Sequence, residues 1–378
     1  MVSKNAGKYE PKRNEICLMG STTSGAKSAI ATGDGNRVAA LKQRFRRQSF
    51  LLVVLLFIVL LLLPRVPGVQ GWMAAQAALI IIYIIAAQGV ALLVGYTGLV
   101  SVGHGGFLAI GAYTAALLTK YFAVDMLLAI AAGGLTAALA GVLLGLVFLR
   151  LSGPFMAIGT LGFAFFIGTV VNNVPLFEGR EGISLPAMNR LFGIQIGDTG
   201  FYYASLAVLA LVTLFLYSLL RSPVGRALRA LRDSEKAAQS SGVNRLFYRT
   251  LAFAISACIT GLAGALNGLV THYVSAEVYG DIWYSVDLLV AVVVGGSSLM
   301  MGPFVGGLFV VMLPYFLDQL ADFASILKGV VLILVLIFAP AGICELIARP
   351  FRALRRRQLA QAGQTSAPAV GAAVAANR

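Results

Sequence analysis

Long apolar runs separated by short polar connections fill most of the chain. Ten such runs occur, at 50–64, 73–94, 104–119, 126–149, 154–174, 201–220, 250–273, 285–295, 303–317 and 325–347. A helix needs about 20 apolar residues to cross a bilayer, and several runs reach that length. None shows the alternating pattern of an outer-membrane barrel strand. The pattern therefore predicts an all-α polytopic membrane protein with about ten transmembrane segments.

Glycines interrupt the apolar pattern at two places, residues 95–107 (GYTGLVSVGHGGF) and 295–307 (GGSSLMMGPFVGG). Glycine is costly inside a helix, and broken backbone at membrane depth persists only where it is buried in protein or lines a watery path. Transporters place such re-entrant or half-helical regions along solute pathways. We therefore predict a translocation pathway lined by Gly95, Tyr96, Thr97, Gly98, Ser101, Gly103, His104, Gly295, Gly296 and Ser297.

Composition and charge placement agree with a membrane protein. Only 12% of the 378 residues are charged, against roughly a quarter in soluble domains. The net charge of +14 comes from basic clusters between or outside the apolar runs, as the positive-inside rule requires, rather than from a nucleic-acid surface. Five of the 29 Lys and Arg residues fall on the outer side: Arg65, Lys120, Arg180, Arg190 and Lys328.

This asymmetry predicts that both ends of the chain are cytoplasmic. Residues 1–49 then form a basic tail without fixed structure, 50–348 the transmembrane domain, and 349–378 a basic and then Ala-rich tail. Residues 51–63 also fit the apolar part of a signal peptide, although we expect a retained anchor. Glycines four apart, such as Gly264 with Gly268 and Gly302 with Gly306, predict close helix packing.

The cytoplasmic segment 221–249 carries no spanning run. Pro223 suits the first turn of a helix, and the residues after it form an apolar stripe and a basic face. Small residues near its end would let a partner's groove approach closely. The predicted contacts with such a partner are Arg226, Arg229, Asp233, Glu235, Ala237, Ala238 and Gly242. The alternative is an amphipathic helix that rests on anionic lipid.

Groups capable of chemistry are few. His104 has no histidine or carboxylate near it in sequence and is expected to be structural, with a proton relay as the alternative. The acidic residues Glu277, Asp281 and Asp287 are expected to be solvated or capping groups. The three cysteines share no metal or redox spacing. No catalytic residue, metal site or cofactor is predicted.

At these residues the chain resembles the integral-membrane permeases of bacterial branched-chain amino acid ABC importers, M-type subunit. The segment 95–114 (GYTGLVSVGHGGFLAIGAYT) is similar to that family's most typical stretch. Similar too are 152–155 (SGPF), 160–163 (TLGF), 222–227 (SPVGRA), 251–266 (LAFAISACITGLAGAL) and 302–303 (GP), so that the resemblance covers roughly 72–345. Against the ABC permease pattern Glu-Ala-Ala-x3-Gly, Ala237, Ala238 and Gly242 match, while Glu235 stands one place early.

The resemblance implies an ABC importer permease fold in the bacterial inner membrane. It implies a homologous second permease, two cytoplasmic ATPase subunits and a periplasmic solute-binding protein as partners, in a lipid membrane. The ATPase subunits would then be the partner that the segment 221–249 contacts. The implied substrate is a branched-chain or other hydrophobic amino acid. Urea or short amides are the alternative within the family, and an ion-coupled secondary transporter is the alternative outside it.

Overall fold

The computed structural model describes residues 71–148, 154–179, 181–185, 190–191, 194–195, 197–296 and 301–317, with a few isolated positions between 57 and 64 and between 329 and 344. Contact clustering separates a unit Met1–Leu60 from a unit Leu61–Arg378, and the account below concerns the second unit. The predicted tails 1–49 and 349–378 lie outside the described residues, as do most residues of the first and last apolar runs.

The eight middle apolar runs coincide with helices. They are α2 (Gly71–Ala91), α3 (His104–Phe122), α4 (Met126–Phe148), α5 (Pro154–Asn173), α6 (Asp198–Arg221), α9 (Arg245–Thr271), α11 (Ile282–Gly295) and α12 (Gly302–Leu317). A π-helix, η2 (Leu92–Thr97), continues α2. Five of the described helical stretches, including 73–97, are long and apolar enough to cross a membrane, and α11 and α12 are shorter apolar helices.

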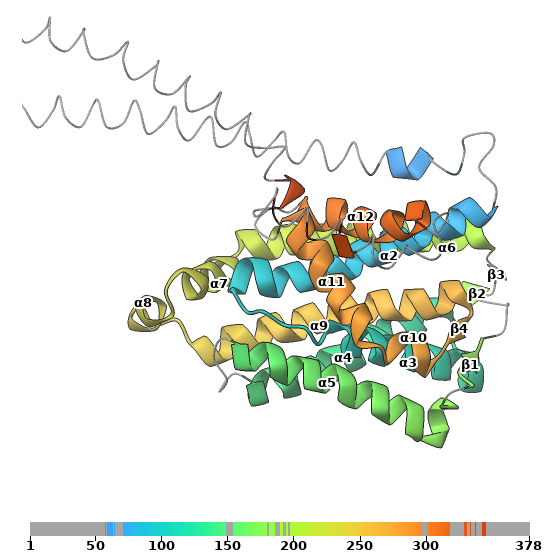
Figure 1. Cartoon of the computed structure of the whole chain (residues 1–378), viewed down its shortest axis with the longest axis horizontal. Coiled ribbons are helices and arrows are strands. Elements are labelled where there is room, and N and C mark those ends of the chain that lie inside the picture. Colours follow the sequence, from blue (N-terminus) through green and yellow to red (C-terminus); the bar gives the residue numbers. More distant parts are fainter. Residues whose placement is uncertain are drawn as a thin grey trace, which may run out of the picture. The chain divides into compact units, whose positions relative to one another are not determined.

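Short elements connect these helices at the two ends of the unit. Helices α7 (Pro223–Asp233) and α8 (Glu235–Ser240) lie at one end, which we call the α7/α8 end (Figure 1). The opposite end carries strand β1 (Ile183–Ser184), antiparallel to β4 (Tyr273–Val274), and strand β2 (Arg190–Leu191), antiparallel to β3 (Ile194–Gln195). The 3-10 turn η3 (Pro175–Phe177) follows α5, and α10 (Ala276–Tyr279) precedes α11.

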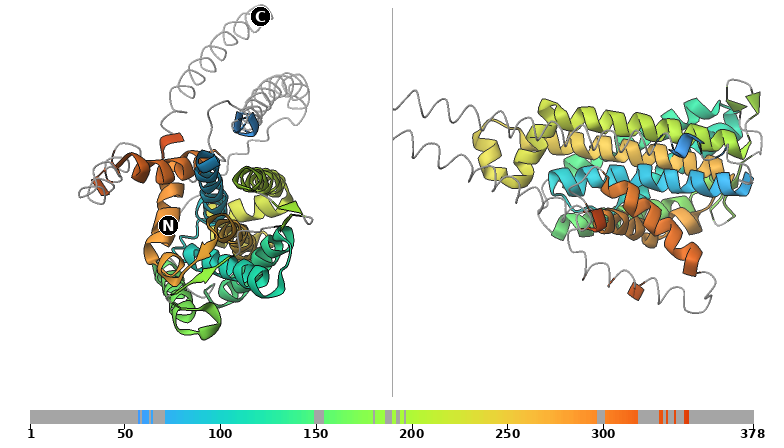
Figure 2. Two further views of the ribbon diagram at one scale, coloured as in Figure 1. Left: turned by 90° about the vertical axis from the view of Figure 1, so that its right-hand side faces the viewer. Right: turned by 90° about the horizontal axis from the view of Figure 1, so that it is seen from above.

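Helix α9 is central to the packing and lies between α2 and α4 in the end-on view of Figure 2. Glycines make this closeness possible. A Cβ atom on Gly264 would lie 2.0 Å from the carbonyl oxygen of Leu108, and one on Gly111 would lie 2.1 Å from that of Gly261. Lipid tails are as apolar as the helices, so close backbone contact of this kind drives helix association. The predicted packing role of Gly264 is confirmed.

The peripheral helices instead expose apolar side chains. Leu139 of α4, Phe165 of α5 and Leu211 of α6 are between 60% and 66% exposed, whereas α2 and α9 are mostly buried. Exposed apolar faces of this extent require cover by lipid or by another membrane subunit.

Candidate functional site

The first glycine run does interrupt a helix. The π-helix η2 ends at Thr97 and is capped by Gly98, whose φ of 71° lies in the left-handed region that glycine adopts without strain. Its N–H and that of Leu99 both reach back to the carbonyl of Leu93, and Thr97 Oγ1 donates to the same oxygen at 2.6 Å. Residues 98–103 are not helical, and α3 begins at His104. Single π-turns of this kind occur frequently at functional sites.

A buried polar chain fixes His104 at the start of α3. Ser256 of α9 donates its only hydroxyl hydrogen to the carbonyl of Gly89 at 2.6 Å, so at 2.7 Å it accepts from His104 Nε2. This assigns the proton to Nε2 and leaves Nδ1 to accept from Ser101 Oγ at 3.3 Å. His104 is 1% exposed. The neutral imidazole is thus satisfied on both sides, which favours the predicted structural role.

Backbone N–H groups at the first break have no helical partner, and hydroxyls from two other helices accept hydrogen bonds from them. Val102 N donates to Thr160 Oγ1 of α5 at 3.0 Å, and Gly105 N donates to Ser285 Oγ of α11 at 2.9 Å. Gly103 is also a packing position, because a Cβ there would lie 2.4 Å from the carbonyl oxygen of Thr160. In this conformation the freed donors bind the protein's own side chains.

The second break joins two helices that touch through their backbones. Helix α11 ends at Gly295, Gly296 has a φ of 100°, and α12 begins at Gly302. A Cβ on Gly295 would lie 1.9 Å from the carbonyl oxygen of Gly302, and one on Gly306 would lie 1.7 Å from that of Ala291. The predicted packing role of Gly302 and Gly306 is confirmed, and Gly295 shares it. Ser297 lies outside the described residues.

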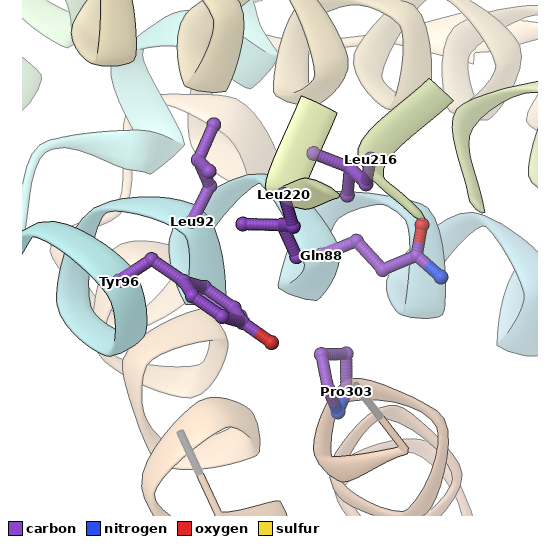
Figure 3. Close-up of a pocket in the computed structure, with 7 residues that line it drawn as sticks. Gln88, Leu92, Tyr96, Leu216, Leu220 and Pro303 are labelled. Carbon is purple, nitrogen blue, oxygen red and sulfur yellow. The ribbon is translucent and has the colours of Figure 1, made fainter. Parts of the chain in front are cut away.

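One pocket receives a residue from each break. Tyr96 of η2 and Pro303 of α12 line it, and the Tyr96 hydroxyl points into it on the side of Pro303 (Figure 3). The remaining lining residues are Gln88, Ala91, Leu92, Leu216 and Leu220. Its volume of about 20 Å³ is about what one water molecule needs. No amino acid fits there in this conformation, so any passage at this point requires the surrounding helices to separate.

The helix α7 connects this region to the surface. Its apolar stripe is buried, with Leu228 at 0% and Leu231 at 3% exposure, while Arg226 and Arg229 are exposed. Arg229 donates to the carbonyls of Gly225 and Leu220, at 3.0 Å and 2.9 Å. The predicted amphipathic helix is therefore present, with its apolar side packed on the chain itself.

Arg232 belongs to the basic face of α7 and was not among the predicted partner contacts, yet it reaches the first break. Its Nη1 donates a hydrogen bond to the carbonyl oxygen of Gly95, which is a predicted pathway residue. Its Cγ would lie 3.2 Å from a Cβ on Gly98. A side chain of the segment 221–249 thus contacts the first break directly. No local signal could reveal this, because the two residues are 137 positions apart.

The predicted partner contacts in and beside α8 divide into two groups. Glu235 is used within the chain, pairing with Arg245 at 2.5 Å and Arg249 at 2.9 Å, and Ala238 is buried at 4% exposure. Ala237 and Gly242 are exposed, as is Asp233 of α7.

Gly242 also has a structural role, as the residue that ends α8. With a φ of 83° it closes α8 in a Schellman motif, in which Gly242 N bonds the Gln239 carbonyl and Val243 N bonds the Ala238 carbonyl. Within the described part of the chain, no group of three His, Cys, Asp or Glu side chains is placed to hold a metal ion.

Comparison with known proteins shows which family this chain is similar to. The family described as "Branched-chain amino acid transport system / permease component" matches residues 72–340. The high-affinity branched-chain amino acid transport system permease protein LivM of Escherichia coli is 33% identical over 292 residues, covering 71% of this chain and 68% of that protein. LivM of Salmonella typhimurium is 33% identical over 307 residues, covering 75% and 72%.

More distant permeases match as well. LivH of Salmonella typhimurium is 28% identical over 69% of this chain and 90% of its own length. The ribose import permease protein RbsC of Haemophilus influenzae is 34% identical over 32% of this chain and 39% of its own length. No solved structure matches. The chain therefore belongs to the family of branched-chain amino acid transport system permease components, which are membrane-spanning transport subunits and not enzymes.

Proposed function

We propose that this chain is the membrane subunit of an ABC importer that moves branched-chain or other hydrophobic amino acids into the cytoplasm. A second, homologous permease completes the pathway, two separate ATPase subunits supply the energy, and a periplasmic binding protein delivers the substrate. The names of the LivM and LivH relatives support such a permease pair. The exposed apolar faces of α4, α5 and α6 leave room for it.

The observation that carries this proposal is the contact of Arg232 with the first break. An ATPase that moves α7 would move the Arg232 guanidinium, and with it the carbonyl of Gly95. Tyr96, the next residue, lines the pocket that also receives Pro303 from the second break. A displacement of α7 therefore reaches both breaks through adjoining residues. A helix that only rested on lipid would need no hydrogen bond to the interior.

The orientation follows from charge. The segment 221–249 holds seven basic residues and includes the whole α7/α8 end, so the positive-inside rule puts this end, and both termini, in the cytoplasm of a bacterial inner-membrane protein. Single cysteines at Ser3, Arg180 and Ala360 in a cysteine-free background test this with an impermeant reagent. Labelling of Ala360→Cys from outside would overturn the orientation.

Uptake in proteoliposomes tests the function. The chain is reconstituted with the permease, ATPase and binding-protein products of its neighbouring genes, and uptake of labelled leucine, urea and ribose is compared with ATP inside. We expect ATP-dependent leucine uptake that an ionophore does not abolish. Uptake of urea alone would favour the amide alternative within the family. Leucine uptake that needs an ion gradient and no ATP would favour a secondary transporter.

A further inference from the structure

A groove of about 610 Å³ opens between the last turns of α5 and the short helix α10. It lies toward the end of the unit that carries β1 and β4 (Figure 1). Its volume is in the range of pockets that bind small molecules, whereas the pocket beside Tyr96 has room for about one water molecule. We call it the α5/α10 groove, and the lining residues that matter below are Phe165, Gly168, Thr169, Asn172, Glu277 and Gly280.

Backbone contact fixes the floor of this groove. A Cβ on Gly168 would lie 2.8 Å from both the Cα atom and the carbonyl oxygen of Gly280, so α5 and the turn after α10 touch with no side chain between them. Ser275 caps α10, and Tyr279 at the other end of that helix is 4% exposed. Both walls are therefore held in place by the fold, and the space between them is preformed.

Each wall carries a polar side chain that the fold leaves open. Glu277 of α10 is exposed, and Asn172 of α5 keeps intermediate exposure. Within the described part of the chain, neither the Glu277 carboxylate nor the Asn172 side-chain amide has a hydrogen-bonding or ionic partner. One wall thus offers a negative charge, and the other offers N–H donors together with a carbonyl acceptor.

The depth of the groove indicates that it holds water rather than lipid tails. Helix α5 is long and apolar enough to cross a membrane, and Thr169 lies about 22 Å from Pro154 along a helix of about 30 Å. The groove therefore reaches below the outer end of the helix. Polar groups inside a membrane are costly and generally face a water-filled cavity or protein. Phe165, one turn deeper and 60% exposed, adds an apolar wall at the inner end.

We propose that the α5/α10 groove is the outer site at which an amino acid enters the permease. This rests on the proposed function, which puts this end of the unit on the periplasmic side. The Glu277 carboxylate binds the ammonium group, the Asn172 amide donates to the carboxylate of the ligand, and Phe165 packs against an aliphatic side chain. A neutral sugar would lack the positive charge that pairs with Glu277.

Protection of a single cysteine from labelling tests the site. Thr169→Cys is placed in a cysteine-free permease and reconstituted with the second permease and the ATPase subunits, without the binding protein. Its reaction with a soluble thiol reagent is timed at rising concentrations of L-leucine. We expect leucine to slow the reaction severalfold. Isocaproate, which is leucine without the ammonium group, should give little protection.

Two further variants show which carboxylate is responsible. Adding Glu277→Gln should raise the leucine concentration that gives half-protection about fivefold, the upper end of the effect for an exposed ion pair. Glu181→Gln is the matched control, because it removes another exposed carboxylate that follows α5 but does not line the groove. With this variant the half-protecting concentration should stay within about twofold.

Three results would overturn the site. The first is no protection by leucine, and the second is equal protection by leucine and isocaproate. The third is unchanged leucine protection in Glu277→Gln together with a higher concentration of binding protein for half-maximal ATPase stimulation, because the groove would then receive a side chain of the binding protein. Leucine uptake by the unsubstituted importer reports separately on the proposed function. Uptake without protection refutes only the groove, whereas the absence of ATP-dependent uptake refutes the proposed function.

Discussion

The two breaks are both rich in glycine, but different forces hold them in place. Hydroxyls of Thr160 and Ser285 and the guanidinium of Arg232 hold the first break. Direct contact between backbones holds the second, at Gly295 and Gly306. Hydrogen bonds can be exchanged as helices move, whereas close-packed backbones move together or not at all. We therefore expect the first break to respond to α7, and the second to move as a rigid hairpin.

The largest effect is expected at the second break. In Gly306→Ala the new Cβ would lie 1.7 Å from the Ala291 carbonyl oxygen, and backbone cannot yield as a side chain does. We expect a loss of about 3 kcal/mol or more, seen as poor recovery of folded protein. Gly162→Ala is the control, because nothing lies within 4 Å of its Cβ. Equal recovery of both variants would contradict the rigid hairpin.

At the first break, Arg232→Ala should separate transport from assembly. A hydrogen bond from a charged donor is worth about 1.5–3 kcal/mol, so leucine uptake should fall on the order of tenfold to a hundredfold. The ATPase should still co-purify. Lys236→Ala removes an exposed cation of the neighbouring helix α8 that is not among the predicted ATPase contacts, and this variant should transport normally. Similar uptake by the two variants would show that the contact of Arg232 with Gly95 does not couple movement of α7 to transport.

A smaller effect is expected from Gly98→Ala. The left-handed conformation costs a residue with a Cβ about 1–2 kcal/mol, and the first break would relax away from its present path. Leucine uptake should fall about fivefold to thirtyfold. Gly98→Asn is the sharper comparison, since asparagine tolerates a positive φ and should recover much of the loss. If alanine and asparagine behaved alike, side-chain bulk against Arg232 would explain the effect better than backbone conformation.

The smallest effect concerns the end opposite α7 and α8. Lys120 pairs with Glu178, and this hydrogen bond lowers the pKa of the Glu178 carboxyl below its usual value of 4.5. The stabilisation is full above pH 4.5 and disappears as the pH falls through the lower folded-state value. Lys120→Ala should therefore lower the Tm slightly at pH 7 and by less at pH 3. An equal loss at both values would point to packing.

The sequence predicted the eight middle apolar helices and where two glycine runs end a helix, because apolar run length and glycine content are local signals. It also predicted the amphipathic helix α7. The sequence could not predict contacts between residues far apart in the chain. The bond from Arg232 to Gly95 and the stacking of Tyr83 on Tyr284 depend on how helices meet. The burial of Ala238 depends on how a six-residue helix packs back on its own chain.

The glycines also show what the sequence can predict and what needs the coordinates. Sequence can say that Gly98 and Gly295 break a helix, since glycine disfavours helices wherever it occurs. Only coordinates show that Gly98 needs its positive φ while Gly295 needs its missing Cβ. The departure of Glu235 from the family pattern also gains a physical reason, because that carboxylate pairs with Arg245 and Arg249 of its own chain.

Movement of the first break under ATPase control is the central claim, and the labelling rate of one cysteine tests it most directly. Tyr96→Cys is placed in a cysteine-free background and reconstituted with the partner subunits. Its reaction with a soluble thiol reagent is then timed without nucleotide and with ATP trapped. We predict a severalfold difference between the two states, and its loss when Arg232→Ala is added. The same difference with and without Arg232 would contradict the account.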